Sequence, residues 1–385
     1  MNVLFVSYYQ YPNGDAGAIR QHVLARLFSN IGANVFIVSM GESTRFNKKD
    51  YDGINYMSLR NPGNDKFTKI KNYLGYKKNL EHILKSTSVK YDIILVVDIP
   101  FHALYFVKRF AKRNDVKLLH DSVEWYSPQQ FKFGSLSMQY ILKDLYNKRW
   151  IDSQFKVIAI SKYLEKHFKD KQNKTTRIPV IMDIRNMSCK KQTNLEKLTL
   201  LYAGSPGKKD YLKEIIEGIA LLEKQIIDKI NFRLIGVDKE QLIELCSVRK
   251  ESIDRLGSSL TAIGKVLRQE VIRNLEEADF TVLLRSPTQR YAKAGFPTKV
   301  VESLATGTPV ICNITSDLGD YIHDGENGII VEDCSAEAFS IAIKKALDLT
   351  FEQRKIMYEN ARRCAEENFD YRLYKETLQE FIKAY

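Results

Sequence analysis

Residues 293–311, K-A-G-F-P-T-K-V-V-E-S-L-A-T-G-T-P-V-I, place a Gly/Pro turn, a lysine and a glutamate within one loop, helix and strand. Pro297 suits the first turn of a helix, where its missing N–H costs nothing. The free amides of Thr298 and Lys299, together with the Lys299 ammonium, would form an anion site, because a helix N-terminus carries partial positive charge. Glu302 follows one turn later and could accept hydrogen bonds from a ribose diol. The pattern therefore predicts a nucleoside-diphosphate site; a helix that merely packs is the alternative.

This segment resembles the donor-binding motif of the retaining glycosyltransferases of family 4, which have the GT-B fold. The family pattern is E-G-F-x-x-x-x-x-E-A-x-A-x-G-x-P-V, and the resemblance implies that Glu302, its second glutamate, binds the ribose. It also implies that the segment after the first glycine holds phosphate and sugar through Gly295, Phe296, Pro297, Thr298 and Lys299. The first glutamate of the pattern is replaced by Ala294, which removes a carboxylate that lies near the donor sugar in the family.

Residues 202–210, Y-A-G-S-P-G-K-K-D, resemble the family's Gly-rich turn, whose Arg and Lys clamp the donor phosphates. Lys209, or else Lys208, matches the Lys, whereas Ser205 occupies the Arg position. Arg285, at the end of a strand expected at 280–284, could supply the missing guanidinium. Residues 263–266 resemble the loop that seats the nucleotide base through backbone contacts.

Residues 11–20 of the first half resemble the family's Gly-rich loop, in which Gly17 would approach the donor diphosphate. His120 ends a predicted strand and matches the histidine that contacts the transferred sugar. Three acceptor candidates follow it: Asp121 and Glu124 for hydroxyl groups, and Trp125 for stacking on a sugar ring.

Short Val/Ile-rich runs alternate with helical patterns in both halves of the chain, which is typical of parallel sheets covered on both faces. We therefore expect two doubly wound Rossmann-like α/β domains facing a cleft (GT-B). Their expected bounds are an acceptor-side domain at 1–181, a linker at 182–197, a nucleotide-sugar domain at 198–365, and a C-terminal helix at 366–385 that packs back on the first domain. The strands are expected at 3–7, 34–39, 91–97, 116–120, 156–160, 198–202, 231–235, 260–263, 280–284, 309–312 and 328–331.

Composition and charge indicate where the protein acts and what kind of surface it meets. The five cysteines are widely spaced without a CxxC pair, no apolar run reaches the length of a membrane span, and no secretory signal is visible, so we expect a cytoplasmic protein. Residues 1–190 contain 31 Lys/Arg and 16 Asp/Glu, whereas residues 191–385 contain 28 and 31. The basic first half, and the lysine-rich, partly apolar stretch 66–90 above all, predict attraction to an anionic membrane surface. An ordinary solvated surface is the alternative, and no nucleic-acid module is visible.

These patterns predict a retaining glycosyltransferase that moves a hexosyl or N-acetylhexosaminyl group from a nucleotide-diphosphate donor, UDP-linked rather than GDP-linked, to a glycan or polyprenyl-linked acceptor in surface polysaccharide biosynthesis. Neither half has a D-x-D at a strand end, so we expect neither metal nor cofactor, with His120, Lys209 and Lys299 as the catalytic groups. Two alternatives remain. The first is a GT-B sugar-nucleotide epimerase, which would need acid/base carboxylates, so Ala294 weighs against it. The second is a non-catalytic nucleotide-sugar-binding subunit, for which Ala294 is the main argument.

Overall fold

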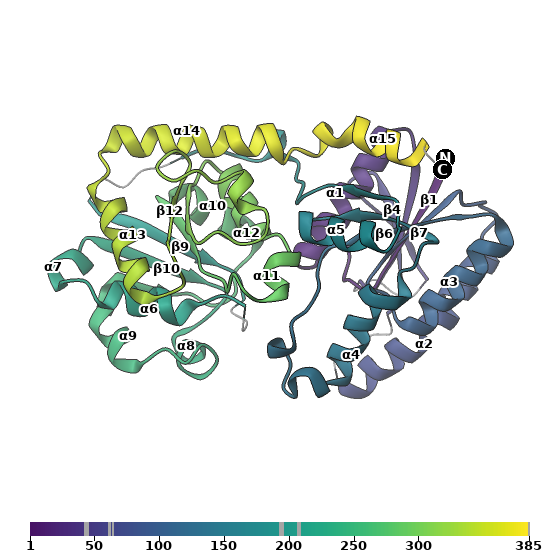
Figure 1. Ribbon diagram of the computed structural model, residues 1–385, viewed down its shortest axis with the longest axis horizontal. Coiled ribbons are helices and arrows are strands. Elements are labelled where there is room, and N and C mark those ends of the chain that lie inside the picture. The colour runs from purple at the N-terminus through teal and green to yellow at the C-terminus, as the bar shows by residue number, and fades with distance from the viewer. Residues whose placement is uncertain (42–45, 61–62, 64, 192–195, 206–208, 384–385) are drawn as a thin grey trace. The chain divides into compact units, whose positions relative to one another are not determined.

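The computed structural model describes residues 1–41, 46–60, 63, 65–191, 196–205 and 209–383, which form two α/β units (Figure 1). The first unit comprises Met1–Tyr126, Ser135–Met182 and Tyr371–Tyr385, and the second comprises Ser127–Gly134 and Asp183–Asp370. Each unit has its own mainly parallel sheet, which confirms the α/β class with two Rossmann-like domains.

The sheet of the first unit has the strand order β3-β4-β2-β1-β5-β6-β7-β8, with β3 antiparallel to β4 and the other pairs parallel. Strands β5 and β7 are buried at every residue, as apolar strands covered by helices on both faces must be. The strands are β1 (Asn2–Ser7), β2 (Asn34–Ser39), β3 (Lys48–Tyr51), β4 (Ile54–Ser58), β5 (Ile93–Val97), β6 (Lys117–Ser122), β7 (Phe155–Ala159) and β8 (Thr175–Arg177). The helices are α1 (Ala16–Asn30), α2 (Lys66–Ser86), α3 (Phe101–Asn114), α4 (Met138–Leu145), α5 (Lys162–Asp170) and α15 (Lys375–Lys383).

The sheet of the second unit is parallel, with the order β11-β10-β9-β12-β13-β14. Its strands are β9 (Leu198–Ala203), β10 (Ile230–Ile235), β11 (Leu260–Ala262), β12 (Phe280–Leu283), β13 (Val310–Cys312) and β14 (Gly328–Ile330). Its helices are α6 (Leu212–Ala220), α7 (Lys224–Ile227), α8 (Lys239–Glu244), α9 (Lys250–Leu256), α10 (Arg268–Glu277), α11 (Arg290–Ala294), α12 (Thr298–Ala305), α13 (Ala336–Asp348) and α14 (Phe351–Asn368).

The strand order of each sheet reverses at one point, between β1 and β5 in the first unit and between β9 and β12 in the second. Ligands of doubly wound folds bind outside the carboxyl ends of the strands at such a point, because the loops there diverge and leave a crevice. The topology therefore directs attention to the residues that follow β1, β5, β9 and β12.

Strand β8, which has three residues, was not expected. Strands β3 and β4 were not expected either, and β3 (K-K-D-Y) is polar and exposed at every residue. The two strands form a hairpin through Asp52 and Gly53, which both have positive φ. An Asp-Gly pair is a strong hairpin signal that a search for apolar runs does not use. Most of the basic stretch 66–90 forms helix α2, Lys66–Ser86, and no helix in the described ranges is both long and apolar enough to cross a membrane.

Helix α6 packs closely on α13 through Gly218, and this contact gives a test of the fold. A Cβ at Gly218 would lie 2.6 Å from the carbonyl oxygen of Ala336.

Gly218→Ala should therefore lower the free energy of unfolding by about 1–3 kcal/mol through overpacking. The control is Gly75→Ala in α2, where the nearest atom to a Cβ lies at 3.8 Å. That control should be neutral or stabilising by up to about 1 kcal/mol, because alanine is the better helix former. Thermal melting followed by circular dichroism measures both, and equal melting points would contradict the close packing.

Candidate functional site

The donor candidates of the second unit gather at the carboxyl ends of β9 and β12. Strand β9 runs into Gly204, whose φ is 147°, and the Lys299 side chain of α12 lies against it. A Cβ at Gly204 would be 2.3 Å from Cε of Lys299. Only glycine leaves room for this lysine at the turn, so the Gly-rich segment and the start of α12 are brought together as the sequence predicted.

One buried carboxylate joins the cations of this cluster. The Arg285 Nε donates to Oδ1 of Asp210 at 2.7 Å, and the Lys299 Nζ donates to Oδ2 at 2.5 Å. The Tyr202 hydroxyl donates to the same Oδ2 at 2.8 Å and accepts from Nζ of Lys299 at 2.7 Å. The sequence placed Lys299 and Arg285 toward a donor phosphate, but it did not identify Asp210 as their shared partner. The available signal was an acidic residue directly after the two lysines of an anion-binding turn.

The charges of the cluster depend on one another. Burial alone would raise the pKa of the Asp210 carboxyl, but Arg285 and Lys299 outweigh burial and hold it well below its usual range. Burial lowers the pKa of Lys299, whereas the Asp210 carboxylate opposes that shift. Burial also disfavours the Arg285 guanidinium, yet Asp210 leaves its pKa raised. The cluster therefore combines two cations with one anion.

Glu302, on the second turn of α12, forms an ion pair with Arg268 at the start of α10. Its side chain is 13% exposed and that of Arg268 is 47% exposed. The Glu302 carboxylate is thus mostly buried and paired with a half-exposed arginine.

The loop before α12 contributes less to a site than expected. The Gly295 amide donates to the Tyr291 carbonyl at 2.9 Å, and Phe296 is buried against the rings of Tyr321 and Phe369. Pro297 is buried at the N-cap, so the amides at the open end of the helix are those of its first residues, Thr298 and Lys299. Ala294 is completely buried in the last turn of α11.

The remaining donor candidates lie around the Gly-rich turn. Ser205 is exposed directly after Gly204, and the Lys209 carbonyl accepts from the Tyr291 hydroxyl at 2.8 Å. Lys208 lies outside the described residues. Residues 263–266 form the loop proposed for the nucleotide base. This loop is bonded to the end of β10, because the amide of Gly236 donates to the Gly264 carbonyl at 2.6 Å.

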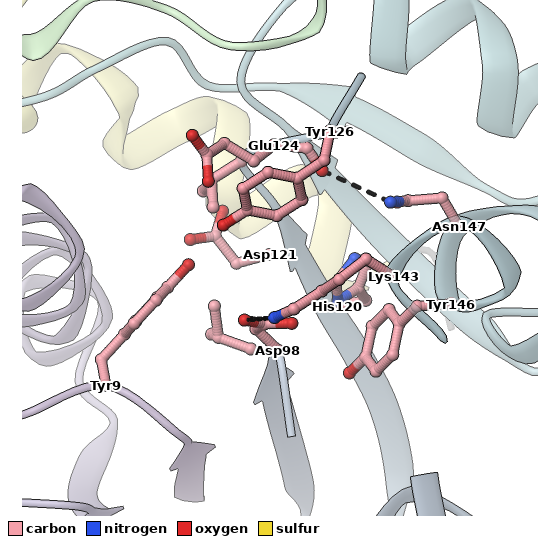
Figure 2. A pocket seen from close by; sticks show the side chains of 11 residues that line it. Tyr9, Asp98, His120, Asp121, Glu124, Tyr126, Lys143, Tyr146 and Asn147 are labelled. Carbon is pink, nitrogen blue, oxygen red and sulfur yellow. Dashed lines mark hydrogen bonds and ion pairs between the residues drawn. The ribbon is translucent and has the colours of Figure 1, made fainter. Parts of the chain in front are cut away.

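The first unit has a pocket at the ends of β1, β5 and β6, and His120 lies in its wall (Figure 2). The Nδ1 atom of His120 lies 3.1 Å from the Val96 carbonyl oxygen. A carbonyl can only accept, so Nδ1 carries the proton. Burial lowers the pKa of His120 to about 4, which makes the imidazole neutral at pH 7 and Nε2 a hydrogen-bond acceptor.

Two of the acceptor candidates have structural partners, which corrects their expected roles. Arg20 donates to both carboxylate oxygens of Asp121, from Nε at 2.9 Å and from Nη2 at 2.7 Å. Its Nη1 atom donates to the Pro179 carbonyl at 2.6 Å. Trp125 is 5% exposed and donates to Oδ1 of Asp144 at 2.9 Å, so its ring is not available to a sugar. Asp121 and Glu124 both line the pocket, whereas Trp125 is not among its lining residues.

The sequence missed several groups of this pocket. Asp98 follows β5 with φ of 49° and forms an ion pair with Lys143 of α4 (Figure 2). Tyr9 and Tyr126 line the same wall. Burial, and to a smaller extent the charge of Glu124, raises the pKa of Tyr126. Asp98 directly follows the strand expected at 91–97, so its place at a strand end was the available signal.

Gly17 supports the pocket rather than facing a ligand. Its amide donates to Oδ1 of Asp15 at 3.0 Å, which caps α1. A Cβ at Gly17 would lie 2.9 Å from the Tyr9 ring, so the glycine allows that ring to pack on the first turn of the helix.

Among the residues that the structure describes, no group of three or more His, Cys, Asp or Glu side chains is arranged to hold a metal ion.

Comparison with solved structures gives the fold of the protein. Sucrose-phosphate synthase from Thermosynechococcus elongatus superposes with a TM-score of 0.74 at 14% identity, covering 100% of this chain and 98% of that chain. WaaG, a glycosyltransferase involved in lipopolysaccharide biosynthesis, gives 0.69 at 16% identity, covering 98% of each chain. HepE of Anabaena in complex with UDP and glucose gives 0.66 at 14% identity over the whole of both chains. The chain therefore has the GT-B fold.

The sequence of the second unit matches a family model. Residues 183–364 match the model of the glycosyl transferases group 1. The chain is also 22% identical to the uncharacterized glycosyltransferase MJ1069 of Methanocaldococcus jannaschii over 288 residues, which cover 72% of this chain and 69% of that protein. The protein carries a group 1 glycosyltransferase domain and is a glycosyltransferase.

The different environments of Asp121 and Glu124 can be tested. Asp121→Asn leaves the 6% exposed Arg20 without its charged partner and should lower the free energy of unfolding by about 3–5 kcal/mol. Glu124→Gln should lower it by less than about 1 kcal/mol, because a carboxamide can retain a hydrogen bond in the pocket wall. Urea unfolding followed by fluorescence compares the two variants, and equal losses would refute the assignment of Asp121 to the framework.

Proposed function

We propose that the protein is a retaining, metal-independent glycosyltransferase that transfers a hexosyl or N-acetylhexosaminyl group from a nucleotide-diphosphate donor to a glycan or lipid-linked acceptor of a surface polysaccharide. The observation that carries the proposal is the pair of cations, Lys299 and Arg285, held at the Gly204 turn beside the start of α12. A UDP-sugar is the favoured donor. The complexes of HepE with UDP and glucose support this choice, and WaaG supports a surface-glycan context.

The chemistry follows from the charges. Glycosyl transfer passes through an oxocarbenium-like state while negative charge grows on the leaving diphosphate. Lys299, Arg285 and the first amides of α12 would stabilise that charge through preorganised electrostatics, together with Lys209. The neutral His120 would accept a hydrogen bond from a sugar hydroxyl. The departing phosphate oxygen would take the acceptor proton, so this route needs no carboxylate nucleophile.

A second candidate function is a non-catalytic nucleotide-sugar-binding subunit. It is favoured by Ala294, where the related motif has a glutamate near the donor sugar. Slow hydrolysis of the donor separates the two functions, because an active transferase releases some sugar to water whereas a binding subunit does not.

Glu302 gives the test of donor binding. Glu302→Ala should weaken UDP-glucose binding about tenfold or more, because one charge-assisted hydrogen bond contributes about 1.5–3 kcal/mol. Arg268→Ala is the matched control, since it removes the ion-pair partner and keeps the carboxylate. Calorimetry measures both affinities, and unchanged affinity of Glu302→Ala would refute ribose binding.

Metal independence is tested separately with a chelator. Transfer or donor hydrolysis should continue in EDTA, and activity that stops in EDTA and returns with Mn²⁺ would refute metal-free transfer.

Peripheral membrane docking through α2 is part of the proposal. Phe67, Ile70 and Leu74 are 77%, 57% and 66% exposed, and they repeat along one face of α2. At about 100° per residue, Lys71, Lys77 and Lys78 fall on the same third of the helix. An exposed apolar stripe flanked by lysines matches a membrane surface that carries anionic lipids. We propose that this face rests on the cytoplasmic leaflet, where a polyprenyl-linked acceptor would be found.

The docking face predicts a salt-sensitive interaction. The wild-type protein should co-sediment with anionic vesicles and much less with neutral ones, and added salt should weaken binding because charges are screened over about 10 Å at 0.1 M. Changing Lys71, Lys77 and Lys78 to Glu should abolish binding. The control changes Lys239, Lys250 and Lys355, exposed lysines of the second unit, to Glu and has the same net charge. Equal loss in both triple variants would make the effect one of net charge, and no binding by the wild type would refute docking.

A further inference from the structure

Asp210 is held in place by the backbone around it. The Tyr211 amide donates to the Leu284 carbonyl at 3.0 Å, and the carbonyl of Lys209 accepts from the Tyr291 hydroxyl at 2.8 Å. The residues on both sides of Asp210 are thus fixed to the end of β12 and to α11. The backbone on both sides of Asp210 is therefore anchored, and its carboxylate is 4% exposed.

A carboxylate beside an anion site needs a physical reason, because it reduces the attraction of the two cations for a diphosphate. Burial provides that reason. Lys299 is part-buried, with a side chain 27% exposed and an ammonium 4.1 Å from the centre of the Tyr202 ring. A desolvated amine close to a guanidinium favours its neutral form. The Asp210 carboxylate offsets both effects.

The groups facing Lys299 come from four segments. Desolvation, the largest influence, and the Arg285 guanidinium at the end of β12 lower the pKa of Lys299. The Asp210 carboxylate and Glu302, one turn along α12, raise it. The Tyr202 hydroxyl accepts from its Nζ and therefore also favours the ammonium. Of these groups, Asp210 has the only carboxylate in direct hydrogen-bond contact with Nζ among the described residues.

We propose that Asp210 is a positioning residue for the donor: its carboxylate keeps Lys299 cationic and holds Lys299 and Arg285 against the Gly204 turn, ready for a diphosphate. This inference rests on the proposed function, because it concerns the same donor site. It assigns Asp210 no contact with the donor. The residue acts through the two cations, and its removal should therefore change how donor binding depends on pH.

The pH dependence has a definite sign. Lys299 is cationic below its pKa, so donor affinity falls as pH rises through that pKa. Asp210→Asn removes the larger of the two carboxylate influences that raise the pKa of Lys299, so the loss of affinity should begin at lower pH than in the wild type. At about pH 6 the variant should bind UDP-glucose within about threefold of the wild type, and at about pH 9 at least about tenfold more weakly. UDP-glucose suits this test because its diphosphate has no group that titrates in this range.

Two measurements test the proposal. Calorimetry with UDP-glucose from pH 6 to 9 compares the wild type, Asp210→Asn and the control Asp254→Asn, an exposed carboxylate of α9. Carbon-13 NMR of ε-labelled lysine follows the titration of Lys299 directly, with Lys299→Arg identifying its signal. The expected results are a lower Lys299 titration midpoint and an earlier loss of affinity in Asp210→Asn alone. A loss of affinity that is equal at every pH, with an unchanged midpoint, would overturn the proposal.

A second variant covers the case in which Asp210→Asn does not fold. Arg285→Gln removes the neighbouring guanidinium, so it should shift the Lys299 titration to higher pH, the opposite direction. An unchanged titration in Arg285→Gln would show that the groups are not coupled and would also overturn the proposal. If UDP-glucose does not bind the wild type, the proposed donor is wrong, while the NMR titration still decides the role of Asp210.

Discussion

A buried carboxylate that holds two cations is the interaction on which the second unit's site depends. Asp210 connects the turn after β9 with the end of β12 and the start of α12, three segments that converge where the strand order reverses. A lone charge at this depth would be unfavourable, and each partner removes that penalty for the others. The same contacts thus define the shape of the turn and supply the positive charge that a diphosphate requires.

The first unit follows the same physical rule with different residues. At the carboxyl ends of its strands, Asp121 of β6 is paired with Arg20 of α1, and Asp98, which follows β5, is paired with Lys143 of α4. Each pair joins a strand end to a helix that reaches the sheet from elsewhere in the sequence. These ion pairs join the pocket wall to two helices, and Glu124 and the neutral His120 are among the polar groups that line the pocket.

The sequence predicted the apolar strands and the α/β class, because apolar runs and Gly/Pro turns are local signals, but it did not predict β3, β4 or β8. It could not predict which charges pair. Arg285 and Lys299 meet Asp210 across 75 and 89 residues, and Arg20 meets Asp121 across 101. These distant pairings explain why Asp121 was taken for a ligand and why Asp210 was passed over. The polar strand β3 was missed because it carries no apolar pattern.

The path of the chain has a consequence for the order in which the protein can be built. The first unit is assembled from three stretches, and its last stretch begins at Tyr371, after all of the second unit has been synthesised. Tyr371 and Leu378 belong to the apolar core beneath α1, and the Lys156 ammonium donates to the Phe381 carbonyl at 2.6 Å. During synthesis the second unit can therefore close first, while the earlier-made unit waits for the final helix before its core is complete.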